Sequence, residues 1–140
     1  MPDSLTFLGM DFGMKRIGVA VGQTVTGTAS PLCILKARDG VPQWSALDQI
    51  IKTWAPNQIV LGIPVHMDGT ESSMTVCARS FKRKVAHRYG IPVSEMEERL
   101  SSEAAAWHVH ASGADSDLDL DAHAAALMLQ SFLESLSRNA

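Results

Sequence analysis

Several features are scarce or missing in this chain of 140 residues, and each gap excludes a class of protein. No apolar run approaches the roughly 18 residues that a membrane helix requires. Residues 1–9 lack the basic start and the long apolar stretch of a signal peptide, so we expect a cytoplasmic protein without a membrane partner. The two cysteines, Cys33 and Cys77, lie in separate apolar runs outside any metal-binding pattern, which predicts buried thiols rather than a disulfide framework or a zinc site.

The chain is 46% hydrophobic and 19% charged, which is the composition of a globular protein. Its length suits one domain over residues 1–140, and we find neither an internal repeat nor a linker.

The formal net charge of −3 conceals a segregation of charge along the chain. The acidic residues Asp115, Asp117, Asp119 and Asp121 fall within seven residues. A basic segment lies elsewhere and contains Arg79, Lys82, Arg83, Lys84 and Arg88. An acidic site and a basic face together are typical of a metal-dependent enzyme that acts on a polyanion.

The first half of the chain predicts mostly strands. Residues 5–12 and 17–22 form two short apolar runs around the turn 13–16, which predicts a β-hairpin. Residues 29–35 predict a third strand that lies at an edge or begins near Pro31, because proline removes a ladder hydrogen bond. Residues 42–55 have helical spacing of apolar side chains, and the continuous apolar run 58–63 predicts a strand buried on both faces.

The second half predicts alternating helices and strands. A helix follows the N-cap candidates 70–73 and ends at Gly90, and residues 92–96 predict a fifth strand. We expect a short helix over 101–110, a polar loop over 110–119 and a last helix with an apolar stripe from Ala125 to Leu136. Hairpins followed by crossover units predict an α/β fold, a mixed five-stranded sheet with helices on both faces.

Asp11 ends the first predicted strand between Gly9 and Gly13. A carboxylate at the end of a buried strand is costly unless it is paired or binds a metal, and the glycines would let a phosphate approach. The alternative is an aspartate that caps the turn through its own backbone.

Two further carboxylates have a related placement. Glu98 ends the fifth strand, and strand ends at one edge of an α/β sheet are where ligands usually bind, whereas Glu97 points to the other side. Asp121 continues the apolar stripe of the last helix and is expected to point at the sheet, although it could simply cap that helix. Three such oxygen ligands, Asp11, Glu98 and Asp121, suit Mg²⁺ or Mn²⁺.

Four segments that contain these residues resemble the signature blocks of the YqgF/RuvX family. They are LGMDFGMKRIGVAVGQ (8–23), LGIPVHMDGTE (61–71), ERLSSEA (98–104) and DAHAA (121–125). The resemblance runs in order over nearly the whole chain. It implies an RNase H-like fold and a bacterial nuclease, described both as a Holliday junction resolvase and as a nuclease that matures precursor 16S ribosomal RNA. It also implies that Asp11, Glu98 and Asp121 are the catalytic carboxylates.

The chain departs from the family pattern at three places. Glu97 stands where relatives usually have aspartate, and His66 stands where they have asparagine. The segment before Asp121 is acidic where relatives tend to carry lysines, which weakens phosphate binding there unless metal ions neutralise it.

The basic side chains supply candidate phosphate contacts. Lys15 and Arg16 lie in the turn after the first strand, while the second helix contributes a cationic face opposite its apolar stripe. The predicted substrate-binding residues are Lys15, Arg16, His66, Arg79, Lys82, Arg83 and Arg99. The alternatives are a solvated helix face, a surface histidine, and an ion pair of Arg99 at the strand end.

Together these features predict a two-metal endonuclease that cuts structured nucleic acid, most simply at the 5′ end of precursor 16S ribosomal RNA. One rival is a resolvase of branched DNA, which would act as a dimer, whereas a ribonuclease could be a monomer or weak homodimer. The other rival is a non-catalytic module that binds RNA or the ribosome-assembly machinery with a vestigial acidic site.

Overall fold

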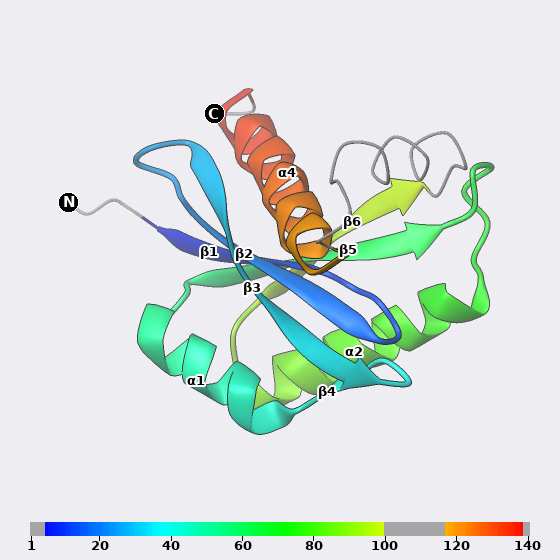
Figure 1. The fold of residues 1–140 in the computed structure, drawn as a ribbon. Helices are drawn as coiled ribbons and strands as arrows, with labels where there is room; N and C mark the ends of the chain where they lie inside the picture. The colour runs from blue at the N-terminus through cyan, green and yellow to red at the C-terminus, as the bar shows by residue number, and fades with distance from the viewer. Residues whose placement is uncertain (1–4, 100–116, 139–140) are drawn as a thin grey trace.

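The computed structural model describes residues 5–99 and 117–138, and Figure 1 shows its elements. The strands are β1 (Thr6–Asp11), β2 (Arg16–Gln23), β3 (Thr28–Arg38), β4 (Val41–Pro42), β5 (Gln58–Val65) and β6 (Val93–Arg99). The helices are α1 (Trp44–Trp54), α2 (Ser73–Tyr89) and α4 (Asp117–Arg138).

The strands form one mixed sheet in the order β4-β3-β2-β1-β5-β6. The first three pair as an antiparallel meander, while β5 lies parallel to both β1 and β6. This confirms the predicted α/β fold with a mixed sheet. The sheet has one strand more than the five predicted, because Val41–Pro42 adds a short pair to the end of β3.

Pro31 sits where the ladder between β2 and β3 is irregular. The register shifts between Val19, which faces Cys33, and Ala20, which faces Pro31. On its other side β3 pairs with β4 only through Ala37 and Arg38, so Pro31 interrupts no second ladder within the described strands. The strand is not the edge of the sheet that the sequence predicts, because β4 follows it, but beside Pro31 it has a described ladder partner on one side only, which accommodates the proline.

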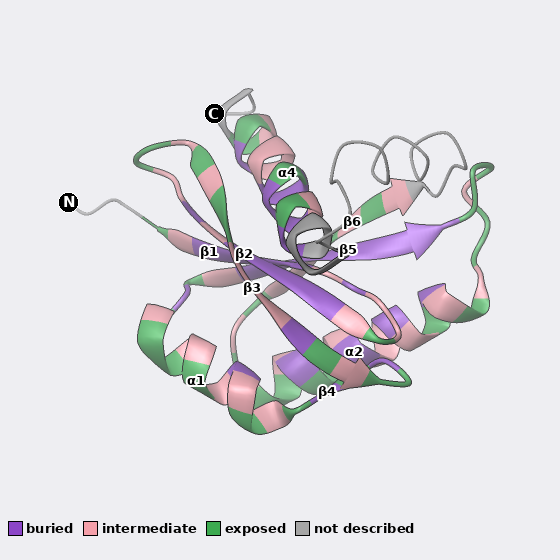
Figure 2. Ribbon diagram, in the orientation of Figure 1, coloured by how far each residue is buried: buried purple, intermediate pink, exposed green. Residues whose placement is uncertain are grey.

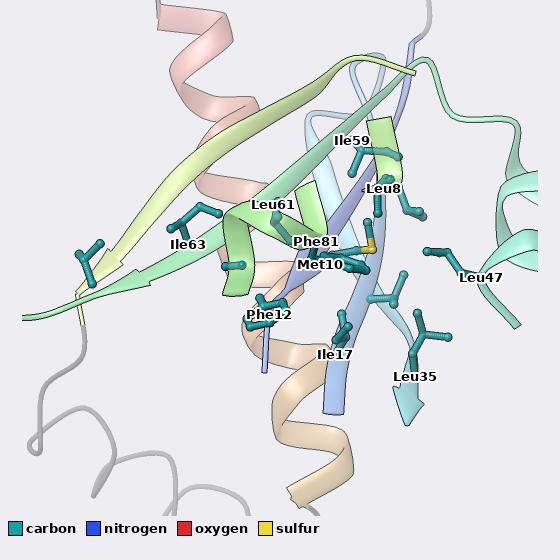
Figure 3. Close-up of a cluster of buried hydrophobic side chains, with 14 residues drawn as sticks. Leu8, Met10, Phe12, Ile17, Leu35, Leu47, Ile59, Leu61, Ile63 and Phe81 are labelled. Carbon is teal, nitrogen blue, oxygen red and sulfur yellow. The ribbon is translucent and has the colours of Figure 1, made fainter. Parts of the chain in front are cut away.

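The two faces of the sheet carry separate cores. Figure 2 shows buried residues along the central strands and on the helices to either side of the sheet. One face packs against α1 and α2 through alternate residues such as Met10, Leu61 and Phe81, which Figure 3 shows together. The opposite face packs against α4 through Phe7, Val60 and Leu129. Since side chains alternate along a strand, Asp11 and Gly62 lie on the α4 face.

Local capping fixes the ends of α2. The Ser72 hydroxyl accepts from the Thr75 backbone N–H at 3.2 Å, and the Ser72 N–H donates to the Thr75 hydroxyl at 2.9 Å. Gly90 ends the helix with a φ of 65°, a left-handed conformation that suits glycine. Both ends agree with the sequence-based prediction.

The structure differs from the predictions for the two cysteines and for the start of the last helix. Cys33 and Cys77 are free thiols, but both are half-buried rather than buried, because each packs at the margin of the core. Helix α4 begins at Asp117, so part of the predicted loop 110–119 is helical. The predicted helix 101–110 lies outside the described residues. No helix in the described ranges is long and apolar enough to span a membrane.

Candidate active site

Asp11 lies between two glycines on the α4 face of the sheet. It is the last residue of β1, and its neighbours across the ladders are Gly18 on β2 and Gly62 on β5. Paired residues of adjacent strands share a face, so neither ladder partner of Asp11 places a side chain beside it. The Asp11 carboxylate is therefore flanked on both neighbouring strands by glycine backbone.

The Glu98 side chain reaches Asp11 across Gly62. It lies on β6 opposite Pro64, and β5 separates its strand from β1. A Cβ placed on Gly62 would come within 2.8 Å of Cδ of Glu98, so the Glu98 side chain extends over the glycine. β5 lies between β6 and β1, and because Gly62 has no side chain, the Glu98 side chain can extend across β5 to Asp11.

The two carboxyl groups interact strongly. Burial, then the charge of Asp11 and a hydrogen bond with its side chain, raise the pKa of Glu98 well above its ordinary range. Oε1 of Glu98 is buried and has no hydrogen-bond partner among the described residues. Such an orphaned oxygen next to a second carboxyl group marks a site that can accept a cation. Glu97, the next residue, is exposed on the other side of the strand.

Helix α4 runs over β1 and β2 with its N-terminal part directed toward Asp11. A Cβ on Gly9 would lie 2.9 Å from Cβ of Leu129 and 3.4 Å from the Ala125 carbonyl, and one on Gly22 would meet Leu133. Asp121 lies one turn before Ala125, about 6 Å along the helix, which matches the step of two residues from Gly9 to Asp11. The side chain of Asp121 lies outside the described part of the structure, so its role stays a prediction.

Two cations share the face and the sheet end of the carboxyl pair. Arg16 on β2 lies opposite Lys36 on β3 in the ladder, two residues along from the opposed residues Gly18 and Ile34. Lys15 is exposed in the preceding turn, where its carbonyl accepts from the Ala37 N–H at 2.8 Å. The position of Lys36 beside Arg16 could not be predicted from the sequence, because neighbouring residues do not reveal the register between β3 and β2.

His66 lies farther away in the loop after β5. It is exposed, and its backbone N–H donates to the Thr70 carbonyl at 3.0 Å. It follows Gly62 by four residues, about 13 Å along an extended strand. A role in substrate binding at this loop stays a prediction, as it does for Arg99, whose side chain is not described.

The basic face of α2 lies on the other side of the sheet and is largely paired. Lys82 donates to Glu95 on β6 at 3.0 Å, while Arg79 contacts Glu71 and lies 3.5 Å from Glu95. Arg83 is exposed on the same helix. The ion pairs stabilise the packing of α2 on β6, and phosphate binding by Arg79, Lys82 and Arg83 stays a prediction.

The described residues contain no group of three or more His, Cys, Asp or Glu side chains placed to hold a metal ion. Asp11 and Glu98 supply two oxygen donors, and a third would have to come from outside that part, as predicted for Asp121. Carboxylate oxygens are the ligands that Mg²⁺ and Mn²⁺ prefer.

Comparison with known proteins identifies relatives over almost the whole chain. A family model described as RuvX, Holliday junction resolvase, matches residues 5–135. A Coxiella burnetii (strain RSA 493 / Nine Mile phase I) protein named "Putative pre-16S rRNA nuclease" is 55% identical over 103 residues, 73% of each chain. A Pseudomonas putida protein with the same name is 45% identical over 139 residues, covering 96% of this chain and 99% of its own.

Solved structures match the fold at low identity. RuvC of T. thermophilus in complex with a Holliday junction substrate has a TM-score of 0.53 at 14% identity and covers 94% of both chains. The fowlpox virus Holliday junction resolvase has a TM-score of 0.56 at 16% identity and covers 94% of this chain and 99% of its own. These matches confirm the RNase H-like fold.

Proposed function

The chain belongs to the RuvX family, and from this membership and its carboxyl pair we propose that it is an endonuclease of precursor 16S ribosomal RNA. The observation that carries the proposal is the meeting of Asp11 and Glu98 over Gly62, with one Glu98 oxygen that no described residue pairs. Two carboxyl groups held together over glycine backbone suit a divalent cation, and through it a phosphate, better than a structural role, because they cannot form an ion pair with each other. The named relatives support ribosomal RNA as the substrate.

The donor set fits Mg²⁺ or Mn²⁺, held by Asp11 and Glu98 with Asp121 as the proposed third ligand. When bound, two such ions would activate water and stabilise the leaving oxygen of an in-line displacement. The chain's own contribution is geometric. Gly62 leaves room for the Glu98 side chain to reach Asp11, and Gly18, on the other side of Asp11, leaves room for a phosphate to approach the pair.

The charged groups of the site have different proposed roles. Burial, and then the charge of Asp11, raise the pKa of Glu98 to about 9, so without a cation Glu98 retains its proton at neutral pH. Arg16 and Lys36 lie on the same face and are proposed to bind the phosphates that flank the scissile bond, with Lys15 in the adjoining turn. No histidine base is needed in this scheme.

The second candidate function is resolution of Holliday junctions, which the description of the matching family model favours. A resolvase must cut two strands symmetrically and therefore acts as a dimer, whereas a ribonuclease can act as a monomer or weak dimer.

The test compares cleavage of a precursor 16S RNA end with cleavage of a four-way DNA junction, each with Mg²⁺ or Mn²⁺, together with the protein's mass in solution. We expect metal-dependent cleavage of the RNA that is lost in Asp11→Asn and Asp121→Asn. Preferred cleavage of the junction by a dimer would establish the second function instead. Wild-type cleavage rates in both variants would refute this assignment of the site.

A further inference from the structure

A cavity of about 560 Å³ opens between β3 and the start of α4, on the same face of the sheet as the carboxyl pair. This volume is typical of a site for a small organic group. Its walls come from both elements and include Pro31, Leu32, Cys33, Ile34, Lys36, Ala122 and His123. Most of these side chains are apolar, and Lys36 and His123 are exposed.

The cavity adjoins the carboxyl pair through the ladder of the sheet. Asp11 faces Gly18 on β2, and Gly18 in turn faces Ile34 on β3. Ile34 is thus two strand spacings from Asp11, about 10 Å. Because Gly18 has no side chain, no side chain of β2 separates the two along this row. A single nucleic-acid strand advances about 3.4 Å per stacked nucleotide, so one strand can occupy both places.

The cavity's chemistry selects among ligands. Its described lining contains no acidic residue, while Lys36 supplies a positive charge two positions from Ile34 on the same face. A ligand with a flat apolar body and a nearby negative charge satisfies both features. A nucleotide has this character, because its base buries apolar faces and its phosphate pairs with a cation.

We propose that this cavity is a subsite for one nucleotide of the RNA strand, with the base against Ile34 and Ala122 and a phosphate toward Lys36. The inference rests on the proposed nuclease function and adds how the strand is held beside the cut. The subsite acts on binding of substrate rather than on the chemical step.

The first test is a nuclear magnetic resonance titration of the metal-free protein with uridine 5′-monophosphate and, separately, ribose 5-phosphate. We expect the nucleotide to shift the amide signals of Ile34, Lys36 and His123, and ribose 5-phosphate to bind at least about fivefold more weakly because it lacks the base. Equal binding of the two ligands, or shifts confined to other residues, would overturn the proposal.

The second test uses variants. Ile34→Ala removes part of the apolar wall and Lys36→Ala removes the charge, while Lys52→Ala on α1 is a matched exposed control. We expect the first two to weaken nucleotide binding about three- to tenfold and to raise KM for RNA without lowering kcat, and the control to change neither. Lys36 is exposed, so its variant tests the proposal even if Ile34→Ala disturbs the fold.

The outcomes separate this inference from the nuclease proposal, since nucleotide binding is measured without metal or cleavage. Nucleotide binding at Ile34 in a protein that cuts no RNA would refute the nuclease and retain the subsite. RNA cleavage with an unchanged KM in both variants would refute the subsite and phosphate binding by Lys36, and would leave the assignment of the carboxyl pair as the nuclease site intact.

Discussion

Two carboxyl groups on strands that are not neighbours can meet only where the strand between them presents no side chain. Gly62 supplies that place, since β5 separates β1 from β6 and the Glu98 side chain lies across it. A glycine inside a buried apolar strand otherwise weakens the strand. At this position the cost is offset by the access that it gives Glu98 to Asp11.

The substitution Gly62→Ala tests this arrangement. Its methyl group would overlap the Glu98 carboxyl group and displace it from Asp11. We expect cleavage of RNA to fall about 10- to 100-fold, because displacements of about 1 Å at a reacting group have effects of that size. The measurement is kcat with saturating RNA, alongside a circular dichroism spectrum that verifies an intact fold; unchanged kcat would contradict the account.

The pKa of Glu98 predicts how the stability of the metal-free protein depends on pH. Its pKa is raised in the folded state above the 4.5 of a free side chain, so its contribution to stability is full below that value and is lost as the pH rises toward the folded pKa. Glu98→Gln has no such group. Measured in EDTA, the Tm of the variant should rise relative to that of wild type between pH 5 and pH 8. The expected rise is about 3 °C for each kcal/mol of unfolding free energy that wild type loses.

Parallel plots of Tm against pH for the two proteins from pH 5 to pH 8 would show that Glu98 ionises normally, in conflict with the burial of its carboxyl group. Glu97→Gln is the matched control, because that neighbouring side chain is exposed. We expect its Tm to follow wild type.

At the scale of elements, the loop between β5 and α2 depends on Thr75, the buried polar side chain at the start of the helix. Its hydroxyl donates to the Pro64 carbonyl at 2.5 Å and accepts from the Ser72 N–H at 2.9 Å. One side chain thus ties the helix start to the strand that carries Gly62.

The nearly isosteric Thr75→Val should therefore destabilise the protein by about 1–3 kcal/mol, since it leaves both backbone groups without their partner. Urea denaturation followed by circular dichroism measures this change. Ser73→Ala, an exposed substitution in the first turn, is the control and should have little effect. A Thr75→Val protein as stable as wild type would show that water replaces these bonds.

Most elements could be predicted from the sequence because their signals are local. The N-cap at Ser72, the end at Gly90 and the apolar run of β5 depend only on neighbouring residues. Position across the sheet is not local, and for this reason the sequence reveals neither β4 nor the separation of β6 from β1. The same limit hides Gly18 and Lys36, whose importance comes from the register between strands.

At the scale of the whole molecule, one face of the sheet carries ion pairs of α2, and the other carries the carboxyl pair with two cations. Cations of α2 pair with Glu71 and Glu95 on one side of the sheet, and Arg88 pairs with Asp48 of α1 at 2.7 Å. Arg16 and Lys36 lie on the opposite face with Asp11 and Glu98. The net charge of −3 therefore does not describe what a nucleic acid meets at the site.

This distribution predicts which cations govern the salt dependence of RNA binding. Replacing Arg16 and Lys36 by alanine should weaken binding across sequences and flatten the plot of log affinity against log salt by about 0.7 for each phosphate that is no longer neutralised. Arg79→Ala and Lys82→Ala should change the slope less, because these side chains lie beside Glu95 on the α2 side of the sheet, away from the carboxyl pair. Fluorescence anisotropy in EDTA measures all four; the reverse ranking would place the RNA on the α2 face.

The central claim is that the carboxyl groups which meet over Gly62 form the catalytic site. The most direct measurement is the single-turnover rate of RNA cleavage with Mn²⁺ for Glu98→Gln and Glu97→Gln, two adjacent substitutions that point to opposite faces of β6. We predict that Glu98→Gln abolishes cleavage and that Glu97→Gln retains a rate close to wild type. Equal rates in the two variants would contradict the account.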